Sequence, residues 1–160
     1  MIRPVRLSDA GEIARIYNHY VANTIITFEE EPVEVEEMTR RIESTMRNYP
    51  WLVHESDGKV VGYTYARMWK ERAAYRHAVE TGTYLDPAFT GKGIGTELKI
   101  QLLNILRERS FHAVISGIAL PNPASVALNE KFGFTKVAHF KEVGFKMNRW
   151  IDVGYWQLVL

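Results

Sequence analysis

A glycine-rich turn between an extended run and an amphipathic helix is the feature that most restricts how this chain can fold. The turn, TGKGIG, occupies residues 90–95. Before it, residues 79–86 read VETGTYLD, which is typical of a β-strand that ends ahead of Pro87. After it, apolar residues recur with a helical period at Ile94, Leu98, Leu102 and Ile105. Because residues 111–120, FHAVISGIAL, predict a second buried strand, this part of the chain is expected to form a β-α-β unit.

The turn has two interpretations that its own residues do not separate. Glycines let backbone N–H groups approach phosphate oxygens, and the N-terminus of a helix adds a favourable potential. A flexible turn leading into a core helix fits equally well. Two nucleotide-binding patterns are excluded, because Lys92 is followed by glycine rather than Ser or Thr, and the third glycine of a dinucleotide-binding loop would fall at Thr96 or Leu98.

The remaining segments extend this unit into a mixed sheet. Further strands are predicted at residues 2–7, 51–56, 59–69, 134–145 and 151–160, with a hairpin turn at Asp57-Gly58. Further helices are predicted after a Ser8-Asp9 cap, from Pro32 in a first turn, and over 123–133, which Gly133 ends. No linker or repeat interrupts the chain. The order β-α-α-β-β-β-α-β-α-β-β predicts a single α/β (α+β) domain over residues 1–160, with a twisted mixed sheet of about seven strands flanked by four helices.

Charge and composition exclude several classes of function. The net charge is +1, from 20 basic and 19 acidic side chains, which offers no strongly basic face for nucleic acid or an anionic membrane. The chain has no cysteine, which excludes disulfides, thiolate metal ligands and a cysteine nucleophile. The five histidines lack metal-binding spacing, so no metal is expected. Neither an apolar leader nor a bilayer-spanning run is present, so a cytoplasmic protein is expected.

Several motifs together resemble one enzyme superfamily. YLDP at 84–87, the glycine turn and NPASVALNEKFGF at 122–134 resemble the acetyl-CoA-binding core of GNAT acetyltransferases. The order of strands and helices is also that of the GNAT fold, so the resemblance covers nearly the whole chain. Finer similarity lies in WKERAAY at 69–75 and in the tail GFKMNRWIDVGYWQL at 144–158. These segments look like the phosphinothricin N-acetyltransferase branch and its methionine-sulfoximine-acetylating relatives.

The resemblance implies acetyl-CoA as co-substrate and assigns residues to it. In GNAT enzymes the glycine turn wraps the coenzyme pyrophosphate with backbone amides. The implied coenzyme-binding residues are Leu85, Asp86, Thr90, Gly91, Lys92, Gly93, Ile94, Gly95, Thr96, Asn122 and Ser125. Thr90 departs from the usual Gln or Arg of the family, which removes one side-chain contact but leaves the backbone amides. Asn122 has a helix cap as its alternative role.

The resemblance also implies three catalytic positions. Acetyl transfer to an amine needs a base, a donor to the oxyanion and a proton for the leaving thiolate. Glu80 matches the base of the branch, with an ordinary surface glutamate as the alternative. The backbone N–H of Leu85 or of one of its neighbours is the expected oxyanion donor, because GNAT strands splay there. Asn129 stands where many GNAT enzymes carry tyrosine and the branch often carries histidine as acid. An amide does not titrate, so either acid catalysis is weak, or water or another tyrosine supplies the proton.

The branch implies an anionic amino-acid analogue as acceptor. The implied substrate-binding residues are Phe28, Lys70, Arg72, Tyr75, Thr83 and Tyr84. Lys70 and Arg72 suit anion recognition, with a solvated basic loop as the alternative. The sequence therefore predicts an N-acetyltransferase that acts by direct attack of an α-amine, such as that of phosphinothricin or methionine sulfoximine, and works as a homodimer. Acetylation of another amine, such as a protein N-terminus, and a non-catalytic coenzyme A-binding regulator are the alternatives.

Overall fold

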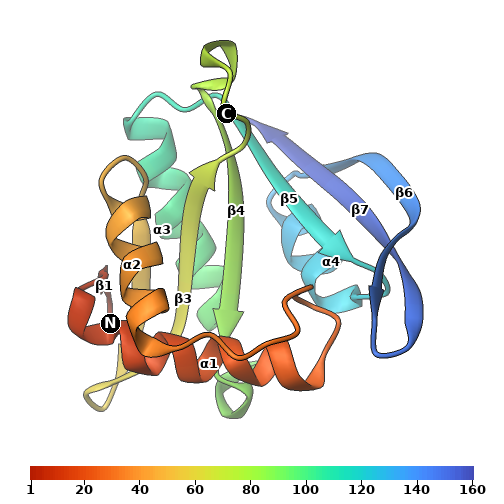
Figure 1. The fold of residues 1–160 in the computed structure, drawn as a ribbon. Coiled ribbons are helices and arrows are strands. Elements are labelled where there is room, and N and C mark those ends of the chain that lie inside the picture. The colour runs from red at the N-terminus through yellow and green to blue at the C-terminus, as the bar shows by residue number, and fades with distance from the viewer.

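The computed structural model describes residues 1–160, and its strands form one seven-stranded sheet (Figure 1). The strands are β1 (Ile2–Pro4), β2 (Trp51–Ser56), β3 (Lys59–Met68), β4 (Ala78–Leu85), β5 (Ala113–Ala119), β6 (Thr135–Lys146) and β7 (Arg149–Val159). Their spatial order is β1-β2-β3-β4-β5-β7-β6. Only β4 and β5 pair in parallel, and every other neighbouring pair is antiparallel. The predicted mixed sheet and the predicted order of elements are confirmed.

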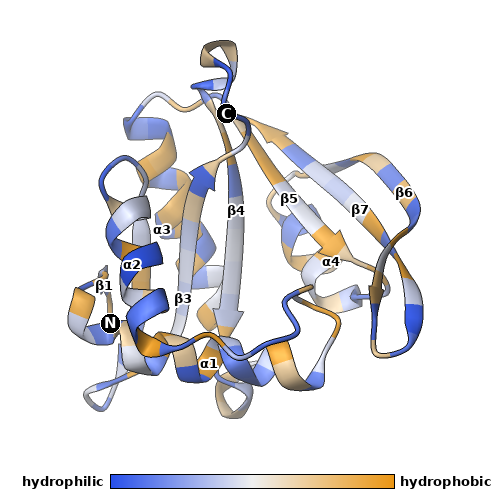
Figure 2. Cartoon of the chain, in the orientation of Figure 1, coloured by the Kyte–Doolittle hydropathy of each residue, from blue (hydrophilic) through white to orange (hydrophobic).

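Four helices cover the two faces of this sheet. They are α1 (Ala10–Asn23), α2 (Val35–Met46), α3 (Ile94–Glu108) and α4 (Pro123–Lys131). One core joins α1 and α2 to the sheet through residues such as Ile42, Trp51 and Val53, and a second joins α3 to it through Leu52 and Leu102. Side chains alternate along β2 because successive residues of a strand face opposite sides. Figure 2 shows that each helix carries both hydrophobic and hydrophilic residues, as a helix with one buried face does. None of the helices combines the length and apolar character that crossing a membrane requires.

Most local signals in the sequence have the structure that they predict. Asp57 and Gly58 both have positive φ, 50° and 74°, as a two-residue hairpin turn between β2 and β3 requires. Gly133, with φ of 87°, follows the end of α4. β4 ends at Leu85, ahead of Pro87. The turn-forming residues therefore determine where these strands and this helix end.

The predicted cap of the first helix is wrong in its side-chain role. Asp9 does precede α1, but its carboxylate makes no capping bond to that helix. It instead accepts hydrogen bonds from the Arg3 guanidinium at 2.9 Å and from the backbone N–H of Arg6 at 2.7 Å. The Arg3 guanidinium holds the pKa of Asp9 below its usual range. A charge-assisted bidentate pair is stronger than a cap, so the carboxylate ties β1 to the start of α1.

The predicted start of the second helix is also wrong. α2 begins at Val35 with Glu34 as its N-cap, so Pro32 lies outside its first turn. The reason lies in Val33, which is buried and bonded on both sides by the Asn18 amide. The backbone N–H of Val33 donates to Asn18 Oδ1 at 2.8 Å, and Asn18 Nδ2 donates to its carbonyl at 2.9 Å. This anchor on α1 delays the second helix until after the buried valine.

β4 and β5 separate soon after they meet. They pair only at Ala78↔Ala113, Val79↔Val114 and Glu80↔Ile115. Beyond these residues β4 continues beside β3, and β5 continues beside β7. The sheet therefore opens into a V between β4 and β5 (Figure 1). Backbone groups on the inner edges of the V have no strand partner, which makes them available to a ligand.

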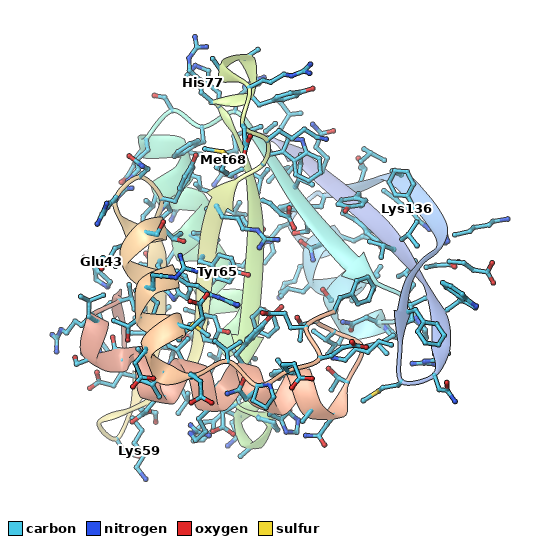
Figure 3. The ribbon with its side chains drawn as sticks, viewed as in Figure 1. Glu43, Lys59, Tyr65, Met68, His77 and Lys136 are labelled. Atoms are coloured by element: carbon cyan, nitrogen blue, oxygen red, sulfur yellow. The ribbon has the colours of Figure 1, made fainter.

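Two exposed regions lie away from the packed faces. The loop of residues 69–77, which ends at His77, lies at the opposite end of the sheet from the Lys59 hairpin (Figure 3). The hairpin of β6 and β7 exposes large apolar side chains, namely Val137, Phe140, Val143, Phe145 and Trp150. Phe145 and Trp150 contact each other with ring centroids 4.9 Å apart. An exposed apolar surface of this kind marks an interaction site more often than a bare solvent face.

Candidate active site

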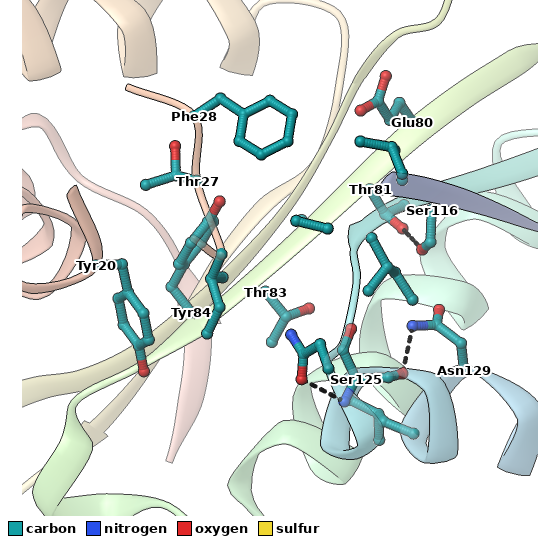
Figure 4. A pocket seen from close by; sticks show the side chains of 18 of the residues that line it. Tyr20, Thr27, Phe28, Glu80, Thr81, Thr83, Tyr84, Ser116, Ser125 and Asn129 are labelled. Carbon is teal, nitrogen blue, oxygen red and sulfur yellow. Dashed lines mark hydrogen bonds between the residues drawn. The ribbon is translucent and has the colours of Figure 1, made fainter. Parts of the chain in front are cut away.

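A cleft of about 1130 Å³ occupies the V between β4 and β5. Its walls come from all four helices, the segment after α1, strands β3, β4 and β5, and the C-terminal hairpin, so the cleft brings together segments far apart in sequence (Figure 4). The predicted site residues that line it are Phe28, Glu80, Thr83, Tyr84, Leu85, Thr90, Gly95, Asn122, Ser125 and Asn129. The sheet topology therefore gathers all three predicted catalytic residues and part of each binding set in one place.

The glycine turn lies beside the cleft at the start of α3. Gly91 and Gly93 have φ of 74° and 84°, a backbone region that favours glycine. Gly93 is the N-cap of α3 and carries no side-chain capping bond, so the N–H groups of the first turn stay free for an anion. Gly91, Lys92, Gly93, Ile94 and Thr96 lie between or next to the lining residues Thr90 and Gly95 without lining the cleft themselves. The turn therefore has N–H donors available for an anion.

Two other predicted coenzyme residues hold local structure. Asn122 is the N-cap of α4, since its Oδ1 accepts from the backbone N–H of Ser125 at 3.2 Å. It also lines the cleft, so the helix-cap and coenzyme roles are compatible. Asp86 does not line the cleft; its carboxylate accepts from the N–H of Ala88 at 3.0 Å and pairs with Arg15 at 2.8 Å. Asp86 therefore shapes the approach to the glycine turn rather than the cleft wall.

Glu80 lies at the vertex of the V. It is the last residue of β4 that pairs with β5, and its side chain is 22% exposed. Its Oε1 accepts from Nη2 of Arg67 at 2.9 Å, across the β3–β4 register. A carboxylate that is oriented by an arginine and open to a cleft is placed to accept a proton. This position differs from that of a freely exposed glutamate.

The backbone N–H of Leu85 points into the gap. The N–H of Asp86 donates to the carbonyl of Val61 on β3 at 2.9 Å. Successive N–H groups of a strand point to opposite edges, so the N–H of Leu85 faces the side where β5 has diverged. The Tyr20 hydroxyl donates to the Leu85 carbonyl at 2.5 Å and holds this peptide in place. A fixed and unpaired donor suits a developing oxyanion.

Tyrosines form one wall of the cleft. The Tyr84 ring makes edge contacts with Tyr17 at 5.2 Å and Tyr20 at 5.4 Å between centroids. Burial raises the pKa of Tyr84 well above its ordinary value, so its hydroxyl stays protonated. Phe28 lies on the same side, with 43% of its surface exposed (Figure 4). This wall of the cleft is therefore aromatic.

The basic loop stands apart from the cleft. Lys70, Arg72 and Tyr75 lie in the exposed segment after β3 and are not lining residues. The Lys70 ammonium lies 5.4 Å from the centroid of the Trp69 ring, and Trp69 makes an edge contact with Tyr155, which does line the cleft. The loop thus touches the cleft wall through one aromatic contact, and the substrate-binding role of its three residues stays a prediction.

Asn129 is buried, and its amide is fully engaged. Its Nδ2 donates to the carbonyl of Ser125 at 2.8 Å, and its Oδ1 accepts from Nζ of Lys99 at 3.1 Å. Lys99 lines the cleft and also lies 3.4 Å from Oγ1 of Thr81. The Thr81 hydroxyl is 3.2 Å from that of Ser116 on β5. A polar chain therefore runs from α3 through the vertex of the V.

Sequence reasoning missed part of the lining. The missed residues include Tyr17, Tyr20, Thr27, Arg41, Arg67, Thr81, Lys99 and Ser116. Lys99 carried a usable signal, because it falls four residues after Gly95 and three before Leu102, on the buried stripe of α3. A lysine on an apolar helical stripe is unusual enough to mark a site. The others carried no local signal, since strand divergence decides which of them face the cleft.

The β-α-β unit with diverging strands, the uncapped glycine turn, and the Glu80 carboxylate and Leu85 N–H at two points of one cleft form the arrangement that the resemblance to acyl-CoA-dependent acyltransferases implies. Residues 2–154 match the Acetyltransferase (GNAT) domain, and the chain belongs to this family. The family and the acetyltransferase activity predicted from the sequence are confirmed. GNAT acetyltransferases use acetyl-CoA, and a solved neighbour was determined in complex with it.

The chain is similar to two relatives over nearly its full length. A phosphinothricin N-acetyltransferase of Streptomyces viridochromogenes is 36% identical over 98% of this chain and 85% of the relative. An L-methionine sulfoximine/L-methionine sulfone acetyltransferase of Salmonella typhimurium is 34% identical over 99% of this chain and 94% of the relative. The crystal structure of a phosphinothricin acetyltransferase from Sinorhizobium meliloti with AcCoA superposes with a TM-score of 0.97 and 36% identity, covering 100% of this chain and 88% of that one.

We expect Gly93→Ala to weaken coenzyme A binding by about tenfold, because an alanine at positive φ is strained by roughly 1–2 kcal/mol and the turn must rearrange. Isothermal titration with coenzyme A measures the change. Gly58→Ala is the matched control, since Gly58 has a similar φ of 74° and lies in a hairpin turn outside the cleft. Both variants should lose similar thermal stability. Equal coenzyme affinity in the two variants would contradict an anion role for the turn.

Proposed function

We propose that the protein transfers the acetyl group of acetyl-CoA to the α-amine of a small anionic amino-acid analogue of the phosphinothricin or methionine sulfoximine kind. The observation that carries this proposal is the cleft, in which the Glu80 carboxylate and the N–H of Leu85 open onto the same V. The names of two full-length relatives support the acceptor class. Residues 1–160 act as one GNAT domain in this proposal.

Binding of acetyl-CoA uses the free amides of the turn at residues 90–96. The pyrophosphate takes these donors, and the pantetheine arm lies along Asn122 and Ser125 at the start of α4. The turn suits an anion because its glycines present N–H groups at the positive end of the α3 dipole. The loss of a Gln or Arg contact at Thr90 removes one side-chain donor only, because Thr90 uses its hydroxyl on the Pro87 carbonyl at 3.1 Å.

The transfer itself is a direct attack. Glu80 takes a proton from the acceptor ammonium through a chain of waters, because Glu80 and Leu85 lie at opposite ends of the same stretch of β4. Arg67 keeps the carboxylate oriented. The freed amine lone pair attacks the thioester carbonyl carbon, and the N–H of Leu85 stabilises the oxyanion. The carbon–sulfur bond then breaks, and its electron pair leaves with sulfur. The chain has no cysteine, so no cysteine thioester of the enzyme intervenes.

Basic side chains approach the anionic group of the acceptor from two sides in this proposal. Arg41 and Arg67 line the cleft and are paired with Glu29 at 2.7 Å and Glu80 at 2.9 Å. The loop of residues 69–77 adds Lys70, Arg72 and Tyr75 from the rim, where Trp69 contacts the cleft wall. In this proposal the loop binds the acidic side chain of the acceptor, and its net positive charge disfavours polyamines.

The exposed hairpin of β6 and β7 forms a homodimer interface in this proposal. Two of its exposed apolar side chains, Phe140 and Val143, also line the cleft. A dimer through this surface would bury apolar area and complete the wall of the cleft. The cytoplasm is the proposed location, because acetyl-CoA is an intracellular metabolite.

We expect purified protein to release free thiol from acetyl-CoA with phosphinothricin and methionine sulfoximine. Turnover should be at least about tenfold slower with spermidine and with a peptide bearing a free N-terminal alanine, because the acidic group of the acceptor contributes charge-assisted contacts. Thiol release across this panel is measured with a chromogenic disulfide. Tight coenzyme A binding with no turnover on any amine would overturn the enzymatic proposal, and preference for the peptide would overturn the acceptor class.

We expect Glu80→Gln to lower kcat at pH 7 by about 100-fold, because the amide cannot take a proton. The deficit should shrink as pH rises toward the pKa of the free acceptor amine, since the amine then enters already neutral. Full pH profiles of kcat for the wild type and the variant measure this. Glu43→Gln, an exposed residue of α2 outside the cleft, is the matched control and should leave the profile unchanged. A loss that is constant across pH would remove Glu80 as the base.

We expect Trp150→Glu to weaken dimerisation at least about 30-fold, because a charge would be buried among apolar side chains at the interface. Light scattering after size exclusion, over a range of concentrations, measures the mass of each species. Ile100→Glu is the matched control, since Ile100 is an exposed apolar residue of α3 away from the hairpin. A monomeric wild type, or a dimer that tolerates Trp150→Glu, would contradict the proposed interface.

A further inference from the structure

Lys99 is a buried lysine that faces the active-site cleft. It lies on the apolar stripe of α3 and is 2% exposed. Its Nζ donates to Oδ1 of Asn129 at 3.1 Å and to Oγ1 of Thr81 at 3.4 Å, and lies 4.4 Å from the centroid of the Phe134 ring. No carboxylate pairs with it. The ammonium is therefore held by neutral groups only.

Burial without a counterion makes this ammonium lose its proton more readily. It lowers the pKa of Lys99 to about 8, with desolvation as the cause. Lys99 is faced by the Thr81 hydroxyl from β4, by the Asn129 amide from α4 and by the Phe134 ring. The ionisable groups that line the cleft elsewhere are Tyr17, Tyr20, Glu29, Arg41, Tyr65, Arg67, Glu80, Tyr84 and Tyr155. None of them hydrogen bonds to Lys99, and desolvation alone lowers its pKa.

The lysine also reaches the vertex where the strands part. Thr81 and Ser116 follow the last paired residues of β4 and β5, and their hydroxyls are 3.2 Å apart. Thr81 is the neighbour of Glu80, whose carboxylate opens to the same cleft. The base is Glu80 itself, and the lysine hydrogen bonds to the next residue of β4, Thr81. The side chains of these two residues leave opposite faces of the strand. An acyl group between the strands has a proton acceptor on one face of the sheet and a proton donor on the other.

We propose that Lys99 is the general acid of the reaction, and that its ammonium gives the proton to the thiolate that leaves acetyl-CoA. The inference rests on the proposed acetyl transfer. When the carbon–sulfur bond breaks, the electron pair goes to sulfur, and a proton moves from Nζ to sulfur directly or along the Thr81 hydroxyl. The products are the free thiol of coenzyme A and a neutral lysine. Glu80 holds the first proton taken from the ammonium, and the attacking nitrogen loses its second proton to solvent as the amide forms. Exchange with solvent then returns Glu80 and Lys99 to their starting states.

Asn129 then has a different role from the one expected at its position. Its Nδ2 bond to the Ser125 carbonyl fixes the amide so that Oδ1 faces Lys99. An amide cannot supply a proton, but it can hydrogen bond to an ammonium without neutralising its charge. A carboxylate in the same place would neutralise that charge. Asn129 is therefore a positioning residue for Lys99. The group that supplies the proton therefore lies on α3 rather than on α4, and one hydrogen bond joins it to Asn129.

A buried ammonium without a counterion also destabilises the fold. The folded state holds the proton less tightly than the unfolded chain, in which a lysine has its ordinary pKa of 10.5, so stability rises with pH between about 8 and 10.5. A purely structural lysine at this place would be better replaced by an apolar side chain of similar size. Lys99→Met should therefore keep or raise the melting temperature at pH 7. A clear fall in the melting temperature of Lys99→Met would mean that Lys99 stabilises the fold, and would contradict a purely functional role.

The decisive measurement is the pKa of the coenzyme A thiol in its complex with the protein, which needs no acceptor and no turnover. Ultraviolet absorbance of the thiolate follows the titration. In the wild type the Lys99 ammonium should lower the pKa of the bound thiol below that of free coenzyme A, and in Lys99→Met this lowering should be lost. Lys131→Met, an exposed lysine on α4, is the matched control and should titrate as the wild type does. An identical thiol pKa in the wild type and Lys99→Met would overturn the proposal.

Turnover provides the second arm. With acetyl-CoA, kcat of the wild type should fall as pH rises through about 8, because the acid loses its proton. Lys99→Met should lower kcat at pH 7 by about 100-fold and lose that limb of the profile. A lower kcat with an unchanged pH profile means a structural role and overturns the proposal. Lys99→Gln, which keeps a donor to Asn129, serves if the methionine variant does not fold. No turnover by the wild type on any amine would count against the proposed function, while the thiol titration still tests Lys99.

Discussion

The parting of β4 and β5 after three paired residues is the constraint on which the rest of the structure depends. A continuous sheet would bond the N–H of Leu85 to β5 and leave no space for a thioester. The separation is held open from both sides, because one core fastens α1 and α2 to β2 and β3, and another fastens α3 beneath β4 and β5. The opened backbone then becomes the binding surface, since its unpaired groups need partners that a ligand supplies.

Charge in the cleft follows from the same opening. Glu80 and Glu29 are each paired with an arginine, so the acceptor side presents organised ion pairs. Tyr17 hydrogen bonds to Glu29 and extends that network into the aromatic wall. Only on the α3 side does a cleft-lining charge lack a partner, at Lys99. The asymmetry separates a place for taking a proton from a place for giving one, as acetyl transfer from a thioester to an amine demands.

Much of the fold was predictable because it is encoded by short-range chemistry. Asp57-Gly58 predicted a hairpin, and the TGKGIG turn predicted a glycine-dependent helix start, and both have the positive φ that favours glycine. The start of the first helix at Asp9 was right, but its side-chain cap failed because the carboxylate pairs with Arg3. The helix start at Pro32 failed because Asn18 holds Val33. The resemblance supplied Glu80, Leu85 and the coenzyme residues, but it supplied Asn129 as the acid position, where the residue type had already ruled out acid chemistry.

By itself, the sequence determined the order of strands and helices, the glycine turn and the family, because periodicity, turn residues and motif spacing are local properties of the chain. Only the tertiary structure decided which side chains share the cleft. Lys99 and Asn129 are 30 residues apart and meet because α3 and α4 pack on the same face of the sheet. Thr81 and Ser116 meet because two strands run parallel and then part. Such contacts depend on the path of the whole sheet, which no short segment of the sequence specifies.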